Sequence, residues 1–432
     1  MNMAETLNLG CLCSTLQPQL LPRELEIHPR LQGMARGLAT SHPHLFSASP
    51  VYLSAADYVA MERSVAALHR ISALPGYEGS ALKRSQPIAA HAFGPRGVFM
   101  GYDFHLSAQG PRLIEINTNA GGAFLHAAAT RAHRSCCEPM DRMFEVPAGL
   151  DQIDRTFIDM FRSEWRAQRG DTPLRSIAIV DDQPEQQYLA PEFEMARELF
   201  LAHGLHAVIA DPAQLEWRGG ALWHPALPEG MPVDLVYNRL TDFDLSDERH
   251  AGLRDAYVSG ATVVTPHPRA HAVHADKRNL VALSDDALLA EWGVATEDRL
   301  LLAAVLPRTR PVTAGDAQAL WAQRRQLFFK PANGYGSKAA YRGDKLTRRV
   351  WGEILAGNFV AQALVPPSER LVDVAGVPMR LKLDIRAYAY DGRIQLLAAR
   401  TYSGQTTNFR TAGGGFSPIV VLPSITETSI SE

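Results

Sequence analysis

The stretch GYDFHLSAQGPRLIEINTNAGG, residues 101–122, places acidic side chains on two short apolar runs that are separated by turn-forming residues. This pattern of apolar residues around a polar, glycine-bearing centre predicts an antiparallel β-hairpin. Asp103 lies on the first expected strand, and Glu115 and Asn117 lie on the second. Because Glu115 and Asn117 are two positions apart, they share one face of their strand.

The register of this hairpin decides whether its acidic side chains meet. If the loop spans residues 107–111, Leu106 faces Arg112 and Asp103 lies directly opposite Glu115. A shift of one residue would send the two carboxylates to opposite faces of the sheet. With the expected loop, the oxygen-bearing side chains of both strands converge on one face.

Two carboxylates directly opposite one another destabilise a sheet unless a positive charge offsets them. A hard divalent cation does so, since Mg²⁺ and Mn²⁺ prefer oxygen ligands and use few protein carboxylates. The hairpin therefore predicts a metal site at Asp103, Glu115 and Asn117. The alternative is a hairpin with one solvated face, on which the acidic residues carry no role.

A second motif is FFKPANGYGSKAAY, residues 328–341, in which a lysine ends an apolar strand and a glycine-bearing loop follows. Glycines let backbone N–H groups wrap phosphate oxygens, and a lysine at the strand end can reach the phosphates. We expect Lys330, Gly334, Gly336 and Ser337 to hold phosphate groups. The alternative is an ordinary glycine-rich hairpin turn.

A third group of charged residues comes near the end of the chain, in LKLDIRAYAY and TTNFRTAGGG. Arginine and lysine on alternate strand positions suit the oxygens of a polyphosphate or an acyl phosphate, because arginine offers a planar fork of donors. An edge strand protected by charges is the alternative. The side chains concerned are Lys382, Asp384, Arg386, Asn408 and Arg410.

The composition of the 432 residues is that of a globular chain, with 46% hydrophobic and 21% charged residues. This length predicts two or three packed units. A net charge of −3 gives no global attraction to nucleic acid or anionic membranes, and no apolar run is long enough to span a bilayer. The four cysteines form two close pairs, Cys11/Cys13 and Cys136/Cys137, which we interpret as reduced thiols. We expect a cytoplasmic protein and leave open whether it is a homo-oligomer.

Changes in pattern along the chain divide it into segments. We expect a helical N-terminal segment over 1–90, the metal-binding hairpin and a helix over 91–150, and a Rossmann-like parallel sheet over 171–275, where strands and helices alternate. In the first segment Ser54 is expected to cap a helix with an apolar stripe at Tyr58, Met61, Val65, Leu68 and Ile71. MRLKLDIRAYAYDGRIQLLAARTYS predicts a second hairpin with its turn at Asp391-Gly392. Nucleotide-binding lobes are expected over 276–423 and a disordered tail over 424–432.

Arg239, in NRLTDF, follows an expected strand of the parallel sheet. Open α/β sheets bind ligands at the carboxyl ends of their strands, so Arg239 is a candidate substrate contact. The nearby run TPHPRAHAVHADK contains His267, His271 and His274. We assign these histidines structural roles, because prolines precede the run and no glutamate accompanies the histidine pair.

Together these motifs resemble the ATP-grasp superfamily. IEINTNAGG is similar to its metal strand, FFKPANGYGS to its lysine strand and mobile loop, and LDIRAY and NFRTAGGG to its Asp-x-Arg and Asn-x-Arg segments. HADKRNL resembles its Asp-Lys helix start, and FVAQALVPPSE resembles the strand whose backbone meets adenine. The resemblance covers roughly residues 98–125 and 233–418.

The resemblance implies roles for individual residues. Metal ligands would be Asp103, Glu115 and Asn117, with two Mg²⁺ or Mn²⁺ ions, and catalytic groups Lys330, Arg386 and Arg410. ATP would be bound by Lys277, Lys330, Gly334, Gly336, Ser337, Gln362, Ala363, Leu364, Glu369 and Asp384. Substrate contacts would come from Asn119, Gly121, Arg239 and Asn408.

The order of the motifs is unusual, because the metal hairpin precedes the nucleotide motifs instead of following them. A circularly permuted ATP-grasp fold of mixed α/β (α+β) class is therefore expected, similar to the group that includes glutathionylspermidine synthetases. The resemblance implies a ligase that joins a carboxylate of an amino acid or peptide to an amine through an acyl phosphate, releasing ADP and phosphate. A small-molecule kinase and a silent nucleotide-binding protein remain alternatives.

Overall fold

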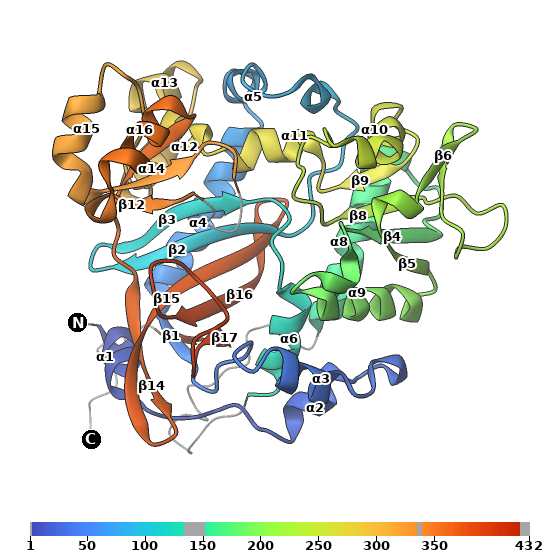
Figure 1. Cartoon of the computed structure of the whole chain (residues 1–432), viewed down its shortest axis with the longest axis horizontal. Helices are drawn as coiled ribbons and strands as arrows, with labels where there is room; N and C mark the ends of the chain where they lie inside the picture. The colour runs from blue at the N-terminus through green and yellow to red at the C-terminus, as the bar shows by residue number, and fades with distance from the viewer. Residues whose placement is uncertain (1, 134–151, 335–338, 424–432) are drawn as a thin grey trace.

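The computed structural model describes residues 2–133, 152–334 and 339–423 (Figure 1). The expected tail at 424–432, the cysteine pair 136/137, and Gly336 and Ser337 lie outside the described residues. Within the described ranges, no helix combines the length and the apolar character that crossing a membrane requires.

A six-stranded antiparallel sheet forms the centre of the molecule (Figure 1). The strand order is β17-β16-β15-β2-β3, and β14 pairs with β15 ahead of the segment that pairs with β2. Both expected hairpins are confirmed, the second with its turn at Asp391-Gly392, where both residues have positive φ. The strands are β2 (Met100–Ser107), β3 (Gly110–Asn117), β14 (Ser368–Val374), β15 (Val377–Tyr390), β16 (Arg393–Tyr402) and β17 (Gly415–Ser417).

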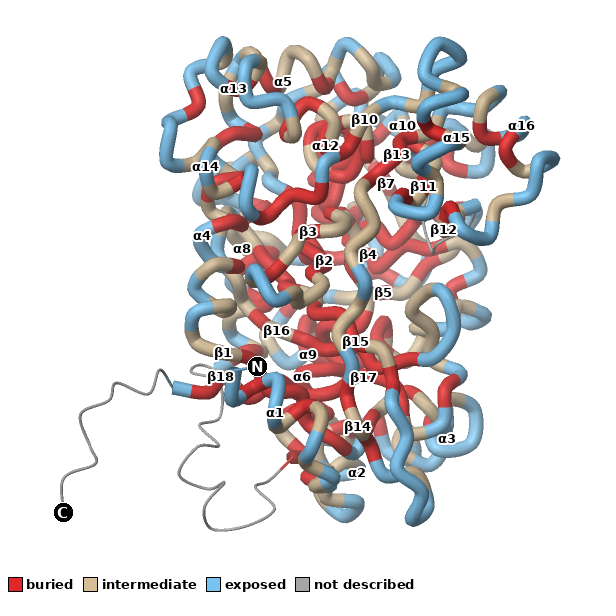
Figure 2. Tube along the Cα trace, turned by 90° about the vertical axis from the view of Figure 1, so that its left-hand side faces the viewer, coloured by how far each residue is buried: buried red, intermediate tan, exposed pale blue. Residues whose placement is uncertain are grey.

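Each face of the central sheet is covered by helices. On one face, α4 and α14 pack over apolar residues that include Ile385 and Ala399. On the other face, α6 and α8 pack over Tyr388, Ala398 and Phe416. The buried core therefore runs through the middle of the molecule, as Figure 2 shows. The helices are α4 (Ala55–Ser72), α6 (Ala123–Arg131), α8 (Ile153–Arg169) and α14 (Thr296–Val305).

The expected helix α4 illustrates how local sequence sets an element. The Ser54 side chain accepts a hydrogen bond from the Asp57 backbone N–H and caps the first turn. Met61, Val65 and Leu68, at helical spacing, are buried against the sheet. The helix was expected at these residues, and its position is confirmed.

A second antiparallel sheet, of order β10-β13-β11-β12, lies beside the central one. Its apolar face packs on Trp351 and Ile354 of α16 and on Leu320 of α15. The strands are β10 (Thr309–Pro311), β11 (Leu327–Pro331), β12 (Tyr341–Arg342) and β13 (Phe359–Ala363). The helices of this region are α12 (Arg278–Leu283), α13 (Asp286–Glu291), α15 (Ala317–Gln323) and α16 (Arg348–Ala356).

The third sheet is parallel, of order β5-β4-β8-β9, which confirms the expected Rossmann-like arrangement. β4, β8 and β9 are buried, near-continuous apolar runs, as expected for a parallel sheet with covered faces, whereas the edge strand β5 begins at the exposed His206. The elements are β4 (Ser176–Val180), α9 (Ala190–Ala202), β5 (His206–Ala210), β8 (Leu235–Asn238), α10 (Ala251–Val258) and β9 (Val263–Thr265). A small hairpin, β6 (Glu216–Arg218) and β7 (Ala221–Trp223), was not expected.

The N-terminal segment is mostly helical, with α1 (Met3–Gly10), α2 (Leu20–Leu25), α3 (Met34–Ser41) and α5 (Pro75–Leu82). It also holds a strand that the sequence pattern did not predict, β1 (Val51–Ser54). This strand pairs in parallel with β18 (Ile419–Leu422), and Ala4 of α1 joins Val420 and Leu422 in one buried cluster, so the two ends of the described chain lie together. A pairing between such distant segments leaves no local periodicity to detect.

Candidate functional site

A cavity of about 300 Å³ lies between the central sheet and the second antiparallel sheet. We refer to it as the first cavity. Many of the residues expected to act on nucleotide or metal line it. They are Asp103, Glu115, Asn117, Lys277, Lys330, Gly334, Gln362, Ala363, Leu364, Asp384 and Arg386.

The turn of the metal hairpin differs from the expected one. β2 ends at Ser107 and β3 begins at Gly110, so the turn is shorter than the expected loop over residues 107–111. As a result Leu106 pairs with Pro111, and the expected pairing of Leu106 with Arg112 is wrong. Gly110 has a φ of 99°, a left-handed conformation that permits the tight turn.

The expected pairing of Asp103 with Glu115 is nevertheless confirmed. A β-bulge restores it, because Phe104 pairs with Leu113 while Asp103 pairs with Glu115, which leaves Ile114 as the extra residue. Without this bulge, the short turn would place Asp103 opposite Ile114. The bulge therefore brings the two carboxylates to one face.

Asp103 is held by two arginines. Arg386 Nε and Nη2 each lie 2.7 Å from its carboxylate oxygens, and Arg400 Nη2 lies 3.0 Å from Oδ2. Burial alone would raise the pKa of Asp103, but the charges of Arg386 and Arg400 hold it well below its usual range. Asp103, which is 3% exposed, is therefore a carboxylate at neutral pH.

Glu115 faces two lysines. Its Oε1 lies 3.1 Å from Lys277 Nζ, and burial, which raises its pKa, is outweighed by Lys277 and Lys330, so that the pKa is lowered. Lys330 Nζ donates to the carbonyl oxygen of the bulge residue Ile114 at 2.7 Å, and Lys277 Nζ donates to that of Gly334 at 2.9 Å. From the sequence we expect a metal ion to offset the carboxylates; in the structure cationic side chains offset both.

The expected metal-binding residues still form a donor set that suits Mg²⁺. Asp103 and Glu115 are paired carboxylates, and Asn117 Nδ2 donates to Asp103 Oδ2 at 3.2 Å. That bond leaves the amide oxygen of Asn117 without a hydrogen bond in the part of the chain that the structure describes. Two carboxylates and one amide oxygen, with other positions left to phosphate and water, match the preference of Mg²⁺ for oxygen ligands.

The strand β13 supplies the wall where the sequence predicts adenine. Gln362 Nε2 donates to Thr309 Oγ1 at 3.4 Å. The backbone N–H groups of Ala363 and Leu364 donate to the carbonyl oxygens of Arg308 and Gln326, each at 2.8 Å. These two N–H groups are therefore engaged within the protein, which leaves carbonyl oxygens and side chains to contact a base.

Six described residues expected at the site do not line the first cavity: Glu369, Asn408 and Arg410, and the substrate contacts Asn119, Gly121 and Arg239. Glu369 lies on β14, where Arg380 Nη1 donates to it at 3.3 Å. The side chain of Asn408 organises its own loop, accepting from the Arg410 backbone N–H at 3.0 Å and donating to the Ser403 carbonyl oxygen at 2.7 Å. Arg410 itself is exposed.

Three expected substrate contacts lie close together: Arg239, which follows β8 and is buried, and Asn119 and Gly121, which lie between β3 and α6 and are half-buried. Arg239 is 7% exposed; its Nη1 donates to the Asn119 carbonyl oxygen at 3.4 Å, and its Nη2 lies 3.7 Å from Glu192 Oε2. A Cβ added at Gly121 would lie 2.6 Å from Arg239 Nη2, so a larger residue there would displace the Arg239 side chain. The geometry gives Arg239 the role of a buried ion-pair partner.

The sequence pattern missed Arg400. This residue binds Asp103 and also donates through Nε to Asp384 Oδ1 at 2.6 Å. Counting back from the tight turn at Asp391-Gly392 would place Ala399 opposite Asp384. A bulge in β15/β16 after Tyr388 shifts the register and places Arg400 there instead. The remaining cavity residues that were missed include His105, Phe328, Arg342, Tyr402, Thr407 and Phe409.

No protein-family model matches this chain, and no curated protein sequence matches it either. Solved structures do. A glutathione synthetase-like effector from Globodera pallida, in the apo form, has a TM-score of 0.57 at 10% identity, covering 94% of this chain and 98% of the other. This likeness shows the fold alone: the chain has the ATP-grasp fold that its motifs predict.

Two further structures match with lower TM-scores. A putative γ-glutamylcysteine synthetase from Methylobacillus flagellatus KT has a TM-score of 0.46 at 9% identity, covering 84% of this chain and 87% of the other. The ATP-grasp ligase PsnB, in complex with a minimal precursor, has a TM-score of 0.34 at 18% identity, covering 57% and 77%. Circular permutation of the fold stays a prediction.

Proposed function

We propose that this chain is an ATP-dependent ligase that joins a carboxylate to an amine through an acyl phosphate. The observation that carries the proposal is the first cavity. There the paired Asp103 and Glu115 face Lys277 and Lys330 in the space between two antiparallel sheets. A cavity lined by carboxylates and by convergent lysines and arginines suits a metal-bound polyphosphate.

ATP would bind with its base toward Gln362 and Leu364 of the second sheet and its phosphates toward Lys277 and Lys330. Asp103, Glu115 and Asn117 would hold Mg²⁺, with two ions expected. When bound, such ions neutralise charge on the phosphate oxygens and orient the γ-phosphoryl group. The buried lysines add fixed positive charge that needs no reorganisation during the reaction.

The reaction follows from this arrangement. A carboxylate oxygen of the substrate attacks the γ-phosphorus, the bond to the β–γ bridging oxygen breaks, and ADP leaves. The amine then attacks the acyl carbon, inorganic phosphate leaves with the bonding electron pair, and the amine proton passes to solvent. Arg386, which lines the cavity and holds Asp103, would stabilise the acyl phosphate.

The substrates belong to the classes that this chemistry requires. An amino acid or peptide would supply the carboxylate, and an amine would supply the nucleophile. The glutathione synthetase-like fold supports this choice.

The test is incubation with MgATP, hydroxylamine and pooled amino acids, glutathione and polyamines, with ADP, AMP and hydroxamate assayed together. A Glu115→Gln variant runs beside the parent chain. Glu297→Gln serves as the matched control, because Glu297 lies on α14 and its side chain is 78% exposed. We expect ADP and hydroxamate from the parent and the control, and loss of about 10²-fold or more in Glu115→Gln.

Other products would point to other chemistry. ADP with a stable phosphorylated product and no hydroxamate would make the chain a kinase. AMP with pyrophosphate would show adenylation and would refute the acyl phosphate. Tight MgATP binding with no turnover in any pool would favour a silent nucleotide-binding protein.

A further inference from the structure

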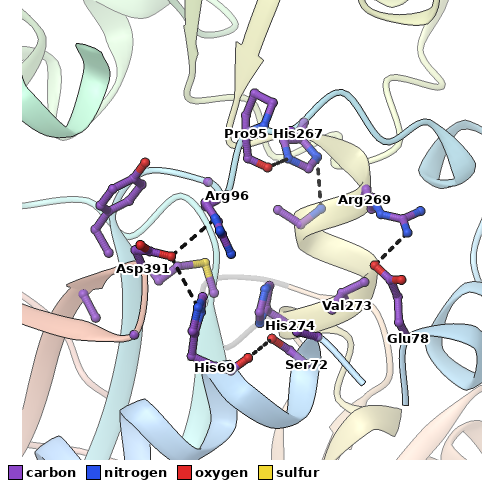
Figure 3. Close-up of a pocket in the computed structure, with 18 of the residues that line it drawn as sticks. His69, Ser72, Glu78, Pro95, Arg96, His267, Arg269, Val273, His274 and Asp391 are labelled. Atoms are coloured by element: carbon purple, nitrogen blue, oxygen red, sulfur yellow. Dashed lines mark hydrogen bonds and ion pairs between the residues drawn. The ribbon is translucent and has the colours of Figure 1, made fainter. Parts of the chain in front are cut away.

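A second cavity, of about 240 Å³, lies apart from the first (Figure 3). Its walls come from the end of α4, the segment 92–97, β2, the turn after β15, and the helical segment 267–274. Figure 3 shows His69, Arg96, His274 and Glu78 around one space. None of the residues expected at the nucleotide site line it.

The two cavities lie on opposite faces of the central sheet. Tyr102 lines the second cavity and the next residue, Asp103, lines the first. Successive side chains of a strand point to opposite faces. A ligand in the second cavity is therefore separated from the first by the sheet, and it cannot be the reacting substrate of the proposed ligase.

Two polar side chains in the second cavity have no hydrogen-bond partner among the described residues. Tyr102 is 3% exposed, and its hydroxyl makes no hydrogen bond to any described residue. Neither ring nitrogen of His274 is hydrogen-bonded within the described ranges. Buried polar groups in proteins are normally hydrogen-bonded, so the Tyr102 hydroxyl lacks what a ligand or water would supply, and the half-buried His274 leaves both ring nitrogens open to the same cavity. By contrast, His267 is satisfied, with Nε2 donating to the Pro95 carbonyl oxygen at 3.0 Å.

Both signs of charge line the same cavity. On one side Asp391 Oδ1 lies 3.3 Å from Arg96 Nε and 3.3 Å from His69 Nε2. On the other side Glu78 Oε1 lies 2.6 Å from Arg269 Nη2. Figure 3 shows these two groups on opposite sides of the cavity, with His274 between them.

Arg96 and Glu78 each have polar atoms that can still form hydrogen bonds with a ligand. The terminal nitrogens of Arg96 make no hydrogen bond to described residues, and its side chain is 53% exposed. Among the residues that the structure describes, only one oxygen of Glu78 is engaged, by Arg269. Arg269 is anchored more firmly, since Nη1 also donates to the carbonyl oxygens of Ala89 and Ala90. Arg96 can therefore donate hydrogen bonds to a carboxylate, and the free oxygen of Glu78 can accept one from an ammonium group.

The histidines do not make this a metal site. Among residues 2–133, 152–334 and 339–423, no group of three or more His, Cys, Asp and Glu side chains is placed to hold a metal ion. Desolvation lowers the pKa of His274 to about 4, so the ring is neutral at pH 7 and offers one donor and one acceptor. The charges on the walls, two arginines against Asp391 and Glu78, sum to zero.

We propose that the second cavity binds a small zwitterion of amino-acid size, with its carboxylate on Arg96, its ammonium group on Glu78, and Tyr102 and His274 hydrogen-bonding between them. The volume lies below the range of about 300–1,000 Å³ that holds drug-sized ligands, which suits a ligand of this size. Balanced charge on opposite walls favours a ligand that carries both signs over a simple anion or cation.

The proposal is tested by binding to the full chain, without ATP. The twenty protein amino acids and glycylglycine are screened at millimolar concentration by ligand-observed NMR, and any that bind are titrated by calorimetry. We expect one or more to bind, with affinity reduced about tenfold or more in Arg96→Gln and in Glu78→Gln, since each substitution removes a charge-assisted hydrogen bond. Tyr102→Phe should weaken binding by a smaller factor.

Matched variants and probes separate the outcomes. Arg155→Gln on α8, where the side chain is 80% exposed, should bind as the parent chain does, and so should Glu115→Gln in the first cavity. For the best ligand, the analogues that lack the amino or the carboxylate group should bind about tenfold or more weakly. Binding that survives both Arg96→Gln and Glu78→Gln, equal binding of inorganic phosphate, or no binding in the whole screen would each overturn the proposal.

Discussion

Arg400 Nη2 on β16 lies 3.0 Å from Asp103 Oδ2 on β2, although β15 separates the two strands in the sheet. Arg400 also binds Asp384 of β15, and Arg386 of the same strand binds Asp103. These four residues form one buried network of two arginines and two carboxylates at the wall of the first cavity. The network fixes the strand that carries the expected metal ligands.

Breaking this network should cost stability. In Arg400→Met, two buried carboxylates lose a shared partner, and we expect the free energy of unfolding to fall by about 3–5 kcal/mol. Arg63→Met, which breaks an exposed pair with Glu297 at 2.6 Å, should change it by no more than about 1 kcal/mol. Urea unfolding at pH 7 measures both. Equal losses in the two variants would show that the buried network contributes no more to the free energy of unfolding than an exposed ion pair does.

Nucleotide affinity should depend on the protonation of Lys330. Burial, assisted by Lys277 and opposed by Glu115, lowers the pKa of Lys330 to about 8. The ammonium form attracts phosphate, so affinity for a non-hydrolysable MgATP analogue should be constant below this pKa and fall as pH rises through it, by up to about tenfold per pH unit. Calorimetry between pH 6.5 and 9.5 tests this.

A charge variant isolates the effect of that residue. Lys330→Met should bind the analogue weakly at all of these pH values, because the titrating charge is gone. If the variant kept the same decline in affinity above pH 8, another group would be responsible for it.

Arg239 should behave as a structural residue. It is buried beside Glu192, whose oxygens also accept from the Gly122 backbone N–H at 2.8 and 2.9 Å. Arg239→Met leaves that buried carboxylate without its ion-pair partner, and we expect a loss of about 3 kcal/mol in the free energy of unfolding. A substrate contact would behave differently: KM would rise while the stability measured by urea stayed that of the parent chain.

Gly122 should tolerate no side chain. It has a φ of +100°, and an added Cβ would lie 2.2 Å from Phe416 Cζ. Gly122→Ala combines a strained backbone with overpacking, so we expect a loss of about 2–5 kcal/mol. Gly220→Ala is the control, because its φ of +75° is similar but nothing lies within 4 Å of the added Cβ. It should lose about 1–2 kcal/mol, and thermal unfolding of both variants would separate the two costs.

The second cavity illustrates what sequence reading could not find. His69, Tyr102 and His274 come from three separate segments, and the motifs that contain Tyr102 and His274 assign functions to neighbouring residues only. From the sequence we assigned His274 a structural role, but the structure places it in a cavity wall, where no described residue hydrogen-bonds to it. Only packing of α4 and the segment 267–274 against the back of β2 brings these side chains together.

The sequence by itself determined the elements and the chemistry of the first cavity. Strand periodicity, the capped helix α4 and the turn at Asp391-Gly392 are local signals, and the glutamate–asparagine and lysine–glycine motifs lie within single strands and loops. Local steric and hydrogen-bonding preferences set such features, so a short window of residues is enough to predict them.

Only the tertiary structure decided which charges meet. The bulge at Ile114 places Glu115 opposite Asp103, and the bulge beyond Tyr388 places Arg400 opposite Asp384. A bulge inserts one residue into a strand pair, and the packing of both strands against the rest of the sheet, more than the residues at that point, determines where it forms. The sequence therefore supplies the side chains of the site, and the strand pairing in the assembled sheet determines which of them contact one another.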